Sequence, residues 1–214
     1  YESNMLNTEK QVNANLLRWY SQNKRDLPWR ELYEDNLPNP YYVFVSEYML
    51  QQTTVNTVKK RFVEFIYKWP SLDKLAVATE PQILKFWSGL GYYSRARNLL
   101  RSAKIIKKKF SSNIPDNYED LIELPGIGDY TAKAILGIAY NKPIMPTDAN
   151  IERILVRLFA IEKPIINIKE KLKKIANKFI SKKSSSNLIQ SFMDYGSSIC
   201  LPRNPKCYEC KINN

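Results

Sequence analysis

Residues 124–131 read Leu-Pro-Gly-Ile-Gly-Asp-Tyr-Thr, and an Asp-Ala-Asn triplet follows at residues 148–150. Two glycines separated by one residue, directly before a predicted helix, leave backbone N–H groups exposed at the positive end of that helix. Such a turn suits one phosphate group. The alternative is an ordinary turn between two helices. Asp148 has no obvious place beside a polyanion unless it takes part in chemistry.

The chain is strongly basic. Its 214 residues include 33 Lys and Arg against 21 Asp and Glu, a formal net charge of +12. This charge favours nucleic acid as a partner, although richness in Lys, Asn and Ile could equally reflect genome base composition. The absence of His excludes Ser-His triads, imidazole acid–base catalysis and His-based zinc sites. Proton transfer must then fall to Asp, Glu, Lys, Tyr or Cys.

Targeting and membrane signals are missing from the sequence. No apolar run approaches the roughly 20 residues that span a bilayer, and the N-terminus lacks the regions of a signal peptide. The chain begins with Tyr1 rather than Met, which suggests a fragment of a longer protein. We expect a cytoplasmic, DNA-associated bacterial protein that is a monomer and does not bind membranes.

Helical periodicity dominates the chain, and alternating strand patterns are nearly absent. Asn39-Pro40 and Thr79-Glu80-Pro81 are strong helix-start signals. The sequence therefore predicts an all-α protein of about ten helices. Beside short segments after Ser71 and Thr79, the expected helices are 8–22, 41–54, 55–69, 92–110, 117–123, 128–140, 148–160, 167–183 and 185–199.

All three cysteines lie near the C-terminus, at Cys200, Cys207 and Cys210. In a reducing compartment this clustering indicates metal ligation rather than a disulfide. The C-x2-C pair fits zinc or iron–sulfur equally well. A zinc site made of cysteines alone and a [4Fe–4S] cluster each normally need four thiolates, and this chain has three. Unligated cysteines are the alternative.

The segment from Ser46 to Thr54 carries one carboxyl, Glu47, in an apolar stretch. A carboxyl among such neighbours is expected to have a raised pKa, which suits a proton donor. A glutamate that points outward from an amphipathic helix is equally compatible with the pattern. Gln51 and Gln52 could hydrogen-bond base edges, or merely cover a helix end.

Residues 89–98 read Gly-Leu-Gly-Tyr-Tyr-Ser-Arg-Ala-Arg-Asn. They combine a flexible turn, two adjacent tyrosines and the arginines Arg95 and Arg97. Aromatic stacking together with phosphate contacts is typical of nucleic-acid binding. The alternative is a turn whose tyrosines pack into the core.

Taken together, these motifs resemble the helix-hairpin-helix base-excision DNA glycosylases, and within them the MutY-type adenine glycosylases. The resemblance runs in order from about residue 10 to residue 210. Its segments are Leu27-Pro28-Trp29-Arg30, Pro40-Tyr41, Ser46-Glu47, Met49-Leu50-Gln51-Gln52-Thr53, residues 89–99, residues 124–128 and the cysteine cluster.

The resemblance implies hydrolysis of the bond between deoxyribose and adenine opposite 8-oxoguanine or guanine in double-stranded DNA. Such a bond breaks through an oxocarbenium-like state, for which a paired acid and carboxylate are expected. Glu47 matches the acid that protonates adenine, and Asp148 the carboxylate that stabilises the cationic sugar. Tyr130 and Asn150 match residues that hold the site together. Positions near the adenine are matched by Trp29, Arg30, Ser46, Leu50 and Asp194. DNA-binding positions are matched by Gln51, by Gln52 and Tyr92, which enter the base stack, and by Gly126 and Gly128, which hold the strand.

Tyr130 bears on whether the strand is cleaved. Bifunctional relatives that resemble endonuclease III place a nucleophilic Lys at this position, whereas a phenol cannot form a Schiff base. The chain therefore resembles a monofunctional enzyme. Lys133 departs from the Gly of many relatives, and its position three residues later puts it on a neighbouring face of the helix.

Two departures point to alternatives. Asp148-Ala149-Asn150 replaces the common Asp-Gly-Asn and is shared with archaeal thymine-mismatch glycosylases, so excision of thymine or uracil from mismatches is a rival activity. The chain also lacks the C-terminal domain that reads 8-oxoguanine. A hairpin DNA-binding module without catalysis is the non-enzyme alternative, although it would not need Glu47 and Asp148.

The family's fold implies two lobes with the site in the cleft between them. A six-helix barrel is expected over residues 25–142, and an iron–sulfur lobe over residues 1–24 and 143–214. Cys200, Cys207 and Cys210 would be three ligands of a [4Fe–4S] cluster, and the fourth cysteine would follow Asn214, at about position 216. The cluster would be structural and would shape a loop in which Arg203 and Lys206 could meet phosphate.

Overall fold

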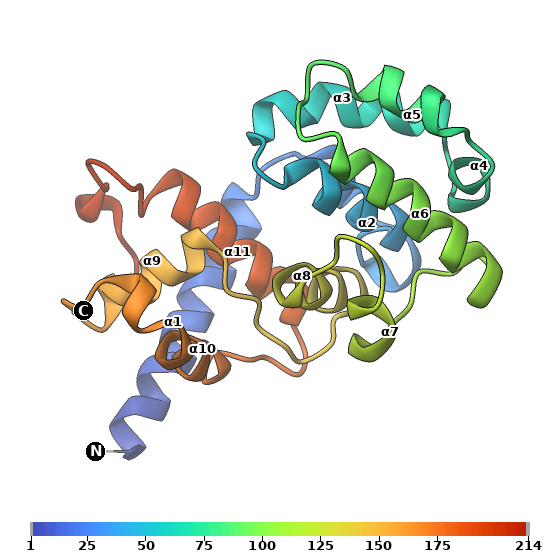
Figure 1. The fold of residues 1–214 in the computed structure, drawn as a ribbon. Helices are drawn as coiled ribbons and strands as arrows, with labels where there is room; N and C mark the ends of the chain where they lie inside the picture. Colours follow the sequence, from blue (N-terminus) through green and yellow to red (C-terminus); the bar gives the residue numbers. More distant parts are fainter. Residues whose placement is uncertain (1, 213–214) are drawn as a thin grey trace. The chain divides into compact units, whose positions relative to one another are not determined.

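The computed structural model describes residues 2–212, and the burial of side chains from residue 8 onward. Within this range it contains eleven α-helices and no β-strand, which confirms the predicted all-α class (Figure 1). The chain divides into two compact units. Unit 1 comprises Tyr1–Arg25 and Asn141–Asn214, and unit 2 comprises Asp26–Tyr140. Among the described helices, none has the length and hydropathy needed to cross a membrane.

Helix α2 (Pro40–Leu50) forms the centre of unit 2. Its start is set by Pro40 at the first turn and by Asn39, whose side chain accepts a hydrogen bond from the Tyr41 amide at 2.9 Å. It packs against α3 (Val55–Lys68), α6 (Ser94–Lys109) and α8 (Asp129–Tyr140). A helix enclosed in this way is apolar on nearly all sides, and its buried residues include Val43, Phe44, Val45, Tyr48 and Met49.

Three shorter helices complete unit 2. Helices α4 (Leu72–Ala76) and α5 (Glu80–Trp87) pack on α6, and α7 (Tyr118–Ile122) packs on α8. A capping box formed by Thr79 and Gln82 begins α5, and the Thr79 amide donates to the Gln82 side chain at 2.9 Å. The start signal at Thr79 therefore acts as predicted.

The predicted helix 41–54 is shorter in the structure, because α2 ends at Leu50. Gln52 adopts a left-handed backbone conformation with φ of 58°, which cannot continue a right-handed helix. Thr54 then caps α3 through a hydrogen bond from the Thr57 amide. Residues 51–54 read Gln-Gln-Thr-Thr and contain no Gly or Pro to mark the break, which explains the overlong prediction.

Unit 1 is built on α1 (Glu2–Asn23), which packs along α11 (Ser185–Ser198). Helix α9 (Ala149–Leu158) packs between α11 and α10 (Lys169–Asn177). The expected helix 167–183 is wrong at its C-terminal end, because the last turn of α10 lies before Lys178. Phe179 packs there against Phe192 of α11, with ring centroids 5.7 Å apart, so burial of this ring takes precedence over continuation of the helix.

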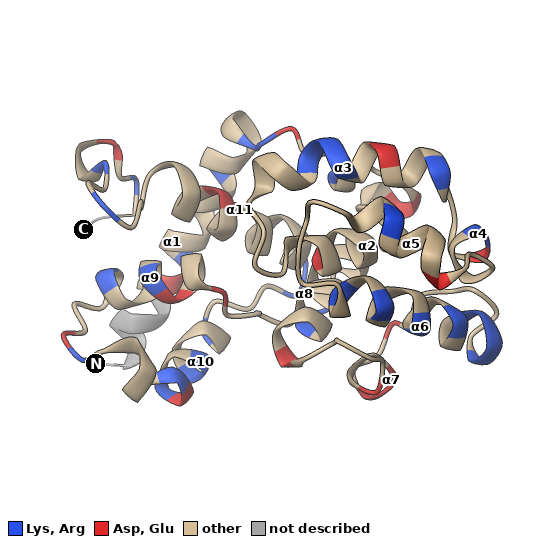
Figure 2. Cartoon of the chain, turned by 45° about the horizontal axis from the view of Figure 1, so that its top comes forward, with Lys and Arg blue, Asp and Glu red and all other residues tan. Residues whose placement is uncertain are grey.

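The basic side chains are spread over both units. Figure 2 shows Lys and Arg along α3, α6 and α10, whereas α7 carries acidic residues. The last turn of α6 consists of Lys107, Lys108 and Lys109. No single helix therefore accounts for the positive net charge.

Candidate functional site

The predicted hairpin joins α7 to α8, and its two glycines differ in their surroundings. Gly126 has a φ of 81°, and a Cβ there would lie 2.9 Å from Asn98 Nδ2 and 3.1 Å from Tyr48 Cε1. Only Gly tolerates both the left-handed backbone and the close packing. A Cβ at Gly128 would meet no atom within 4 Å. Gly126 is thus required by the fold, whereas Gly128 leaves the start of α8 open to a ligand.

The hairpin is attached to α2 by side chains. The Tyr48 hydroxyl donates to the Pro125 carbonyl at 2.5 Å, and the Gln51 amide group donates to the Gly126 carbonyl at 3.2 Å. Burial raises the pKa of the Tyr48 phenol, and the hydrogen bond with Ser102 offsets this in part. The phenol therefore stays protonated and remains a donor. Gln51 thus contacts the hairpin, and its hydrogen bonding to base edges stays a prediction.

Glu47 lies on α2 near its C-terminal end, with 7% of its surface exposed. The alternative of an outward-pointing glutamate is therefore wrong. Ser46 is also buried, and its hydroxyl donates to the Val43 carbonyl at 2.9 Å within the same helix. Leu50, the last residue of α2, is half-buried. The structure thus places a buried carboxyl on α2.

Trp29 and Arg30 lie in a short 3-10 helix, Pro28–Arg30, that packs against α2 and α3. Trp29 is 7% exposed, and its ring meets Phe62 edge to face with centroids 5.5 Å apart. Arg30 is half-buried. Trp29 therefore contributes at least to the core of unit 2.

Two turns of unit 2 present the residues predicted to enter the base stack. Gln52 follows α2 and is exposed, with φ of 58°. Tyr92 precedes α6, with φ of 48° and 61% of its surface exposed. Tyr93 is 41% exposed. The alternative that these tyrosines pack into the core is therefore wrong.

The expectation that both arginines of residues 89–98 contact phosphate fails for Arg95. This side chain is buried, and its guanidinium donates to backbone carbonyls of unit 2 rather than pointing to solvent. Arg97 is half-buried and pairs with Glu80, with 3.0 Å between Nε and Oε1. Helical periodicity could have signalled this difference, because Leu99 and Ala103 follow Arg95 by four and eight positions on the buried face of α6.

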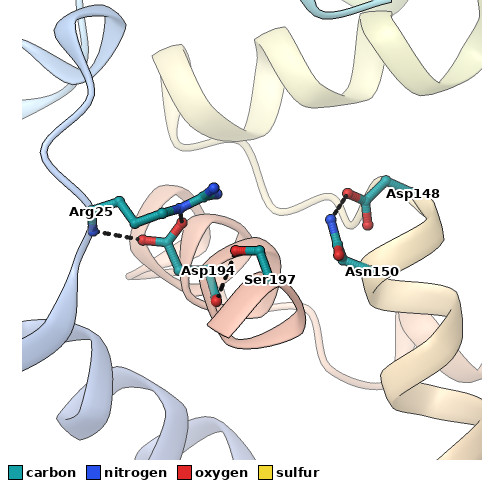
Figure 3. A network of polar contacts seen from close by, with 5 residues as sticks. All are labelled: Arg25, Asp148, Asn150, Asp194 and Ser197. Atoms are coloured by element: carbon teal, nitrogen blue, oxygen red, sulfur yellow. Dashed lines mark hydrogen bonds and ion pairs between the residues drawn. The ribbon is translucent and has the colours of Figure 1, made fainter. Parts of the chain in front are cut away.

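In unit 1, Asp148 caps α9. Its Oδ1 accepts from the Ile151 amide at 2.7 Å, and its Oδ2 accepts from Asn150 Nδ2 at 3.0 Å. Figure 3 shows the Asn150 side chain turned towards this carboxylate. Asp148 is half-buried, so the carboxylate is oriented yet reachable. An N-cap role and a chemical role are compatible, because the cap uses only one of the oxygens.

Arg153 and Gly196, which sequence reasoning missed, surround Asn150. Arg153 Nη2 donates to Asn150 Oδ1 at 2.8 Å and to the Gly196 carbonyl at 2.6 Å, and its Nε donates to the Cys200 carbonyl at 2.8 Å. A Cβ at Gly196 would lie 2.6 Å from Asn150 Cβ. Asn150 is thus held from two sides. The only sequence signal for Arg153 was its position three residues after Asn150 along α9.

Asp194 lies on α11 with its side chain fully buried, and it binds Arg25 twice (Figure 3). Arg25 Nε lies 2.6 Å from Oδ1, and the Arg25 amide donates to Oδ2 at 2.9 Å. A buried carboxylate paired in this way anchors the chain just after α1. The structure therefore shows a structural contact for Asp194.

Tyr130 is half-buried in the first turn of α8. On the same helix, Lys133 Nζ lies 3.0 Å from Asp129 Oδ1, and the Tyr118 hydroxyl donates to that oxygen at 2.9 Å. The ammonium group of Lys133 is thus bound by a carboxylate one helical turn away.

The three cysteines line one cavity of about 290 Å³ in unit 1. Arg157 Nη1 lies 3.4 Å from Cys200 Sγ, and the Tyr195 hydroxyl lies 3.5 Å from Cys210 Sγ. In the described part of the chain, no three Cys, Asp or Glu side chains are grouped to hold a single metal ion. Thiols that face one cavity and have a cation and a hydroxyl beside them fit three ligands of a larger, negatively charged cluster.

The chain is similar to known proteins over most of its length. A family model described as "HhH-GPD superfamily base excision DNA repair protein" matches residues 45–182. An adenine DNA glycosylase of Buchnera aphidicola subsp. Baizongia pistaciae (strain Bp) is 39% identical over 93% of the chain and 56% of its own length. The corresponding figures for an adenine DNA glycosylase of Homo sapiens are 37%, 94% and 38%. The chain thus spans only part of these relatives.

Among solved structures, one described as a thermostable thymine-DNA glycosylase is similar throughout. The TM-score is 0.85 at 27% sequence identity, and the match covers 96% of this chain and 94% of that one.

Proposed function

Since the chain belongs to the HhH-GPD superfamily of base excision DNA repair proteins, we propose that it is a monofunctional DNA glycosylase that releases adenine mispaired with 8-oxoguanine or guanine. The observation that carries this proposal is the likeness to adenine DNA glycosylases at 37–39% identity over 93–94% of the chain. Both Glu47 and Asp148 fall within the range of the family model. A DNA-binding module without catalysis would need neither carboxyl.

Glu47 is proposed as the acid. Its burial on α2 suits a carboxyl that donates a proton to a ring nitrogen of adenine, because protonation turns the base into a better leaving group. The glycosidic bond then breaks through an oxocarbenium-like state, and Glu47 next handles the attacking water. Asp148 stabilises the cationic sugar electrostatically. Asn150 holds the Asp148 carboxylate through Nδ2. Tyr130 is proposed, with Asn150, to hold the catalytic residues in place.

Five further residues are proposed around the adenine, in two kinds. Arg30 and Leu50 are half-buried and are proposed to touch the base. Trp29, Ser46 and Asp194 are buried and are proposed to support the residues that touch the base. Gln52 and Tyr92 enter the base stack when adenine is extruded, because both are exposed at turn positions. Gln51, Gly126 and Gly128 belong to the surface that holds the DNA strand.

The absence of strand cleavage is proposed from two side chains of α8. Tyr130 has no amine with which to form a Schiff base with the sugar. The nearby Lys133 ammonium is bound to Asp129. Strand breaks without added base would contradict this part of the proposal.

We further propose that Cys200, Cys207 and Cys210 ligate a [4Fe–4S] cluster with a structural role, since hydrolysis needs no electron transfer. The cluster would support the loop that carries Arg203 and Lys206, which are proposed to meet phosphate. Purified protein is expected to be brown, with visible charge-transfer absorbance that is lost in Cys207→Ser. A colourless protein that contains zinc would reject the cluster.

The central test is base release under single-turnover conditions from three duplexes, with A opposite 8-oxoguanine, A opposite guanine and T opposite guanine. We expect adenine release from the first two. Glu47→Gln is expected to abolish release without weakening DNA binding. Glu64→Gln, an exposed partner of Arg61 on α3, is the matched control and should react normally. Normal turnover by Glu47→Gln would remove Glu47 from the mechanism.

A second candidate activity is excision of thymine from G·T pairs. It is favoured by the similarity to the thymine-DNA glycosylase structure over 96% of the chain. Thymine release from the third duplex, without adenine release from the others, would establish it in place of the adenine activity.

A further inference from the structure

Arg95 is a buried cation that binds two separate turns of unit 2. Only 5% of the surface of Arg95 is exposed. Nη1 donates to the carbonyls of Met49 at 2.7 Å and of Gln51, and Nη2 donates to those of Leu90 at 3.0 Å and Gly91 at 3.1 Å. The first pair of carbonyls belongs to the end of α2, and the second pair to the turn before α6.

Each of these turns carries one exposed residue other than Gly in a left-handed conformation. Gln52 directly follows one Arg95 acceptor, and Tyr92 directly follows another. A non-Gly residue in this region is strained and persists only where the surroundings hold it. The Arg95 guanidinium also lies 5.7 Å from the centroid of the Tyr92 ring, within the range of a cation–π interaction.

The acceptors that surround Arg95 are neutral backbone groups, and its Nε is buried without a hydrogen-bond partner. Burial of a cation in such a place opposes folding unless the hydrogen bonds offset it. A Leu or Met would fill the same volume without this penalty. The guanidinium, in contrast, can donate in several fixed directions at once, and so it can set the separation of two turns.

We infer that Arg95 is a positioning residue that holds Gln52 and Tyr92 as one rigid wedge for extrusion of the target base. This inference rests on the proposed glycosylase function. Extrusion unstacks the target base, and side chains must fill the gap left in the stack. A wedge that is ordered before binding avoids the entropy loss that two mobile turns would incur.

The test uses Arg95→Met, which removes the donors, and Arg95→Lys, which offers three donors in a different geometry. Arg61→Met is the matched control. Arg61 also donates to backbone carbonyls, those of Phe86 and Ser88, and it lies 4.3 Å from the Phe86 ring centroid. It therefore reports the loss of a structural guanidinium in the same unit. Urea unfolding measures the stability of each variant.

Two readouts separate positioning from stability. The first is the fluorescence rise of 2-aminopurine placed at the target position, measured in the Glu47→Gln background so that no chemistry is required. The second is the excision rate for adenine opposite 8-oxoguanine with matched flanking pairs, divided by the rate for the same mispair flanked on both sides by mismatched pairs. Loose flanking pairs lower the cost of extrusion, so a defective wedge matters less there.

We expect Arg95→Met to lose most of the fluorescence rise and to lower the rate ratio about tenfold. Arg95→Lys should lie between Arg95→Met and the unaltered chain. Arg61→Met should leave the ratio unchanged. If Arg95→Met does not fold, the same criteria apply to Arg95→Lys.

An unchanged ratio and an unchanged fluorescence rise in the Arg95 variants would overturn the inference, as would equal losses in Arg61→Met. These outcomes differ from failure of the proposed function. That failure would appear as no base release by the unaltered chain, and it would leave the fluorescence comparison intact as a test of Arg95.

Discussion

At the scale of single residues, the two hairpin glycines have different reasons to be glycine. Gly126 combines a left-handed backbone with contacts that exclude a side chain, whereas a methyl group at Gly128 would extend into open space. The first reason concerns folding, and the second concerns close approach of a ligand to the backbone. Substitution by alanine separates these two roles.

Gly126→Ala is therefore expected to lower the free energy of unfolding by about 1–3 kcal/mol, because it adds backbone strain and a clash with Asn98. Gly128→Ala should change stability by less than about 0.5 kcal/mol. It should nevertheless weaken duplex binding, because its methyl group lies where a phosphate would approach. Urea unfolding and fluorescence anisotropy measure the two effects. Normal binding by a stable Gly128→Ala protein would argue against phosphate contact at this turn.

Gly196 is a second residue whose missing side chain matters. An alanine Cβ there would overlap Asn150 and displace the amide that holds Asp148. Gly196→Ala should lower the excision rate at least about tenfold while DNA affinity is retained. Ser197→Ala, at the next position of α11, is the matched control. Equal rates for both variants in a single-turnover assay would show that Asn150 tolerates displacement.

At the scale of elements, α9 shows one carboxylate with two roles. Asp148 is the N-cap of α9 through Oδ1 and also receives the Asn150 amide at Oδ2. Asparagine caps helices nearly as well as aspartate but carries no charge. The structural and chemical contributions of Asp148 can thus be measured separately.

Asp148→Asn should keep the free energy of unfolding within about 0.5 kcal/mol, whereas Asp148→Ala should lose about 1 kcal/mol through the missing cap. Both variants should lose excision, because neither can stabilise a cationic sugar. Substantial excision by Asp148→Asn would mean that the charge is not needed. Thermal unfolding followed by circular dichroism, together with base release, distinguishes the cases.

At the scale of the whole molecule, the net charge of +12 predicts binding that depends on salt. Each phosphate neutralised by Lys or Arg adds a slope of about −0.9 to the plot of log affinity against log salt for duplex DNA. If six phosphates are contacted, affinity should fall about a thousandfold between 50 and 200 mM salt. Titrations at four salt concentrations would measure the slope. A slope near zero would exclude backbone contacts as the main source of affinity.

The sequence by itself determined the features that depend on neighbouring residues. Helical periodicity and the caps at Asn39 and Thr79 predicted the all-α class, because these interactions span only a few positions. The hairpin motif and the position of Glu47 within an apolar segment were equally readable. The ends of α2 and α10 were not, because contacts with distant parts of the chain take precedence over periodicity there.

Only the tertiary structure decided which polar groups meet. Arg95 looked like a phosphate contact but is bound to carbonyls 44 to 47 positions away at the end of α2. Asp194 pairs with Arg25 across 169 positions, and Arg153 links Asn150 to the Cys200 carbonyl. The strength of a polar contact depends on the distance between its donor and acceptor atoms and on how deeply both are buried. Neither quantity is encoded at the position of a single residue, and both arise only when the helices pack.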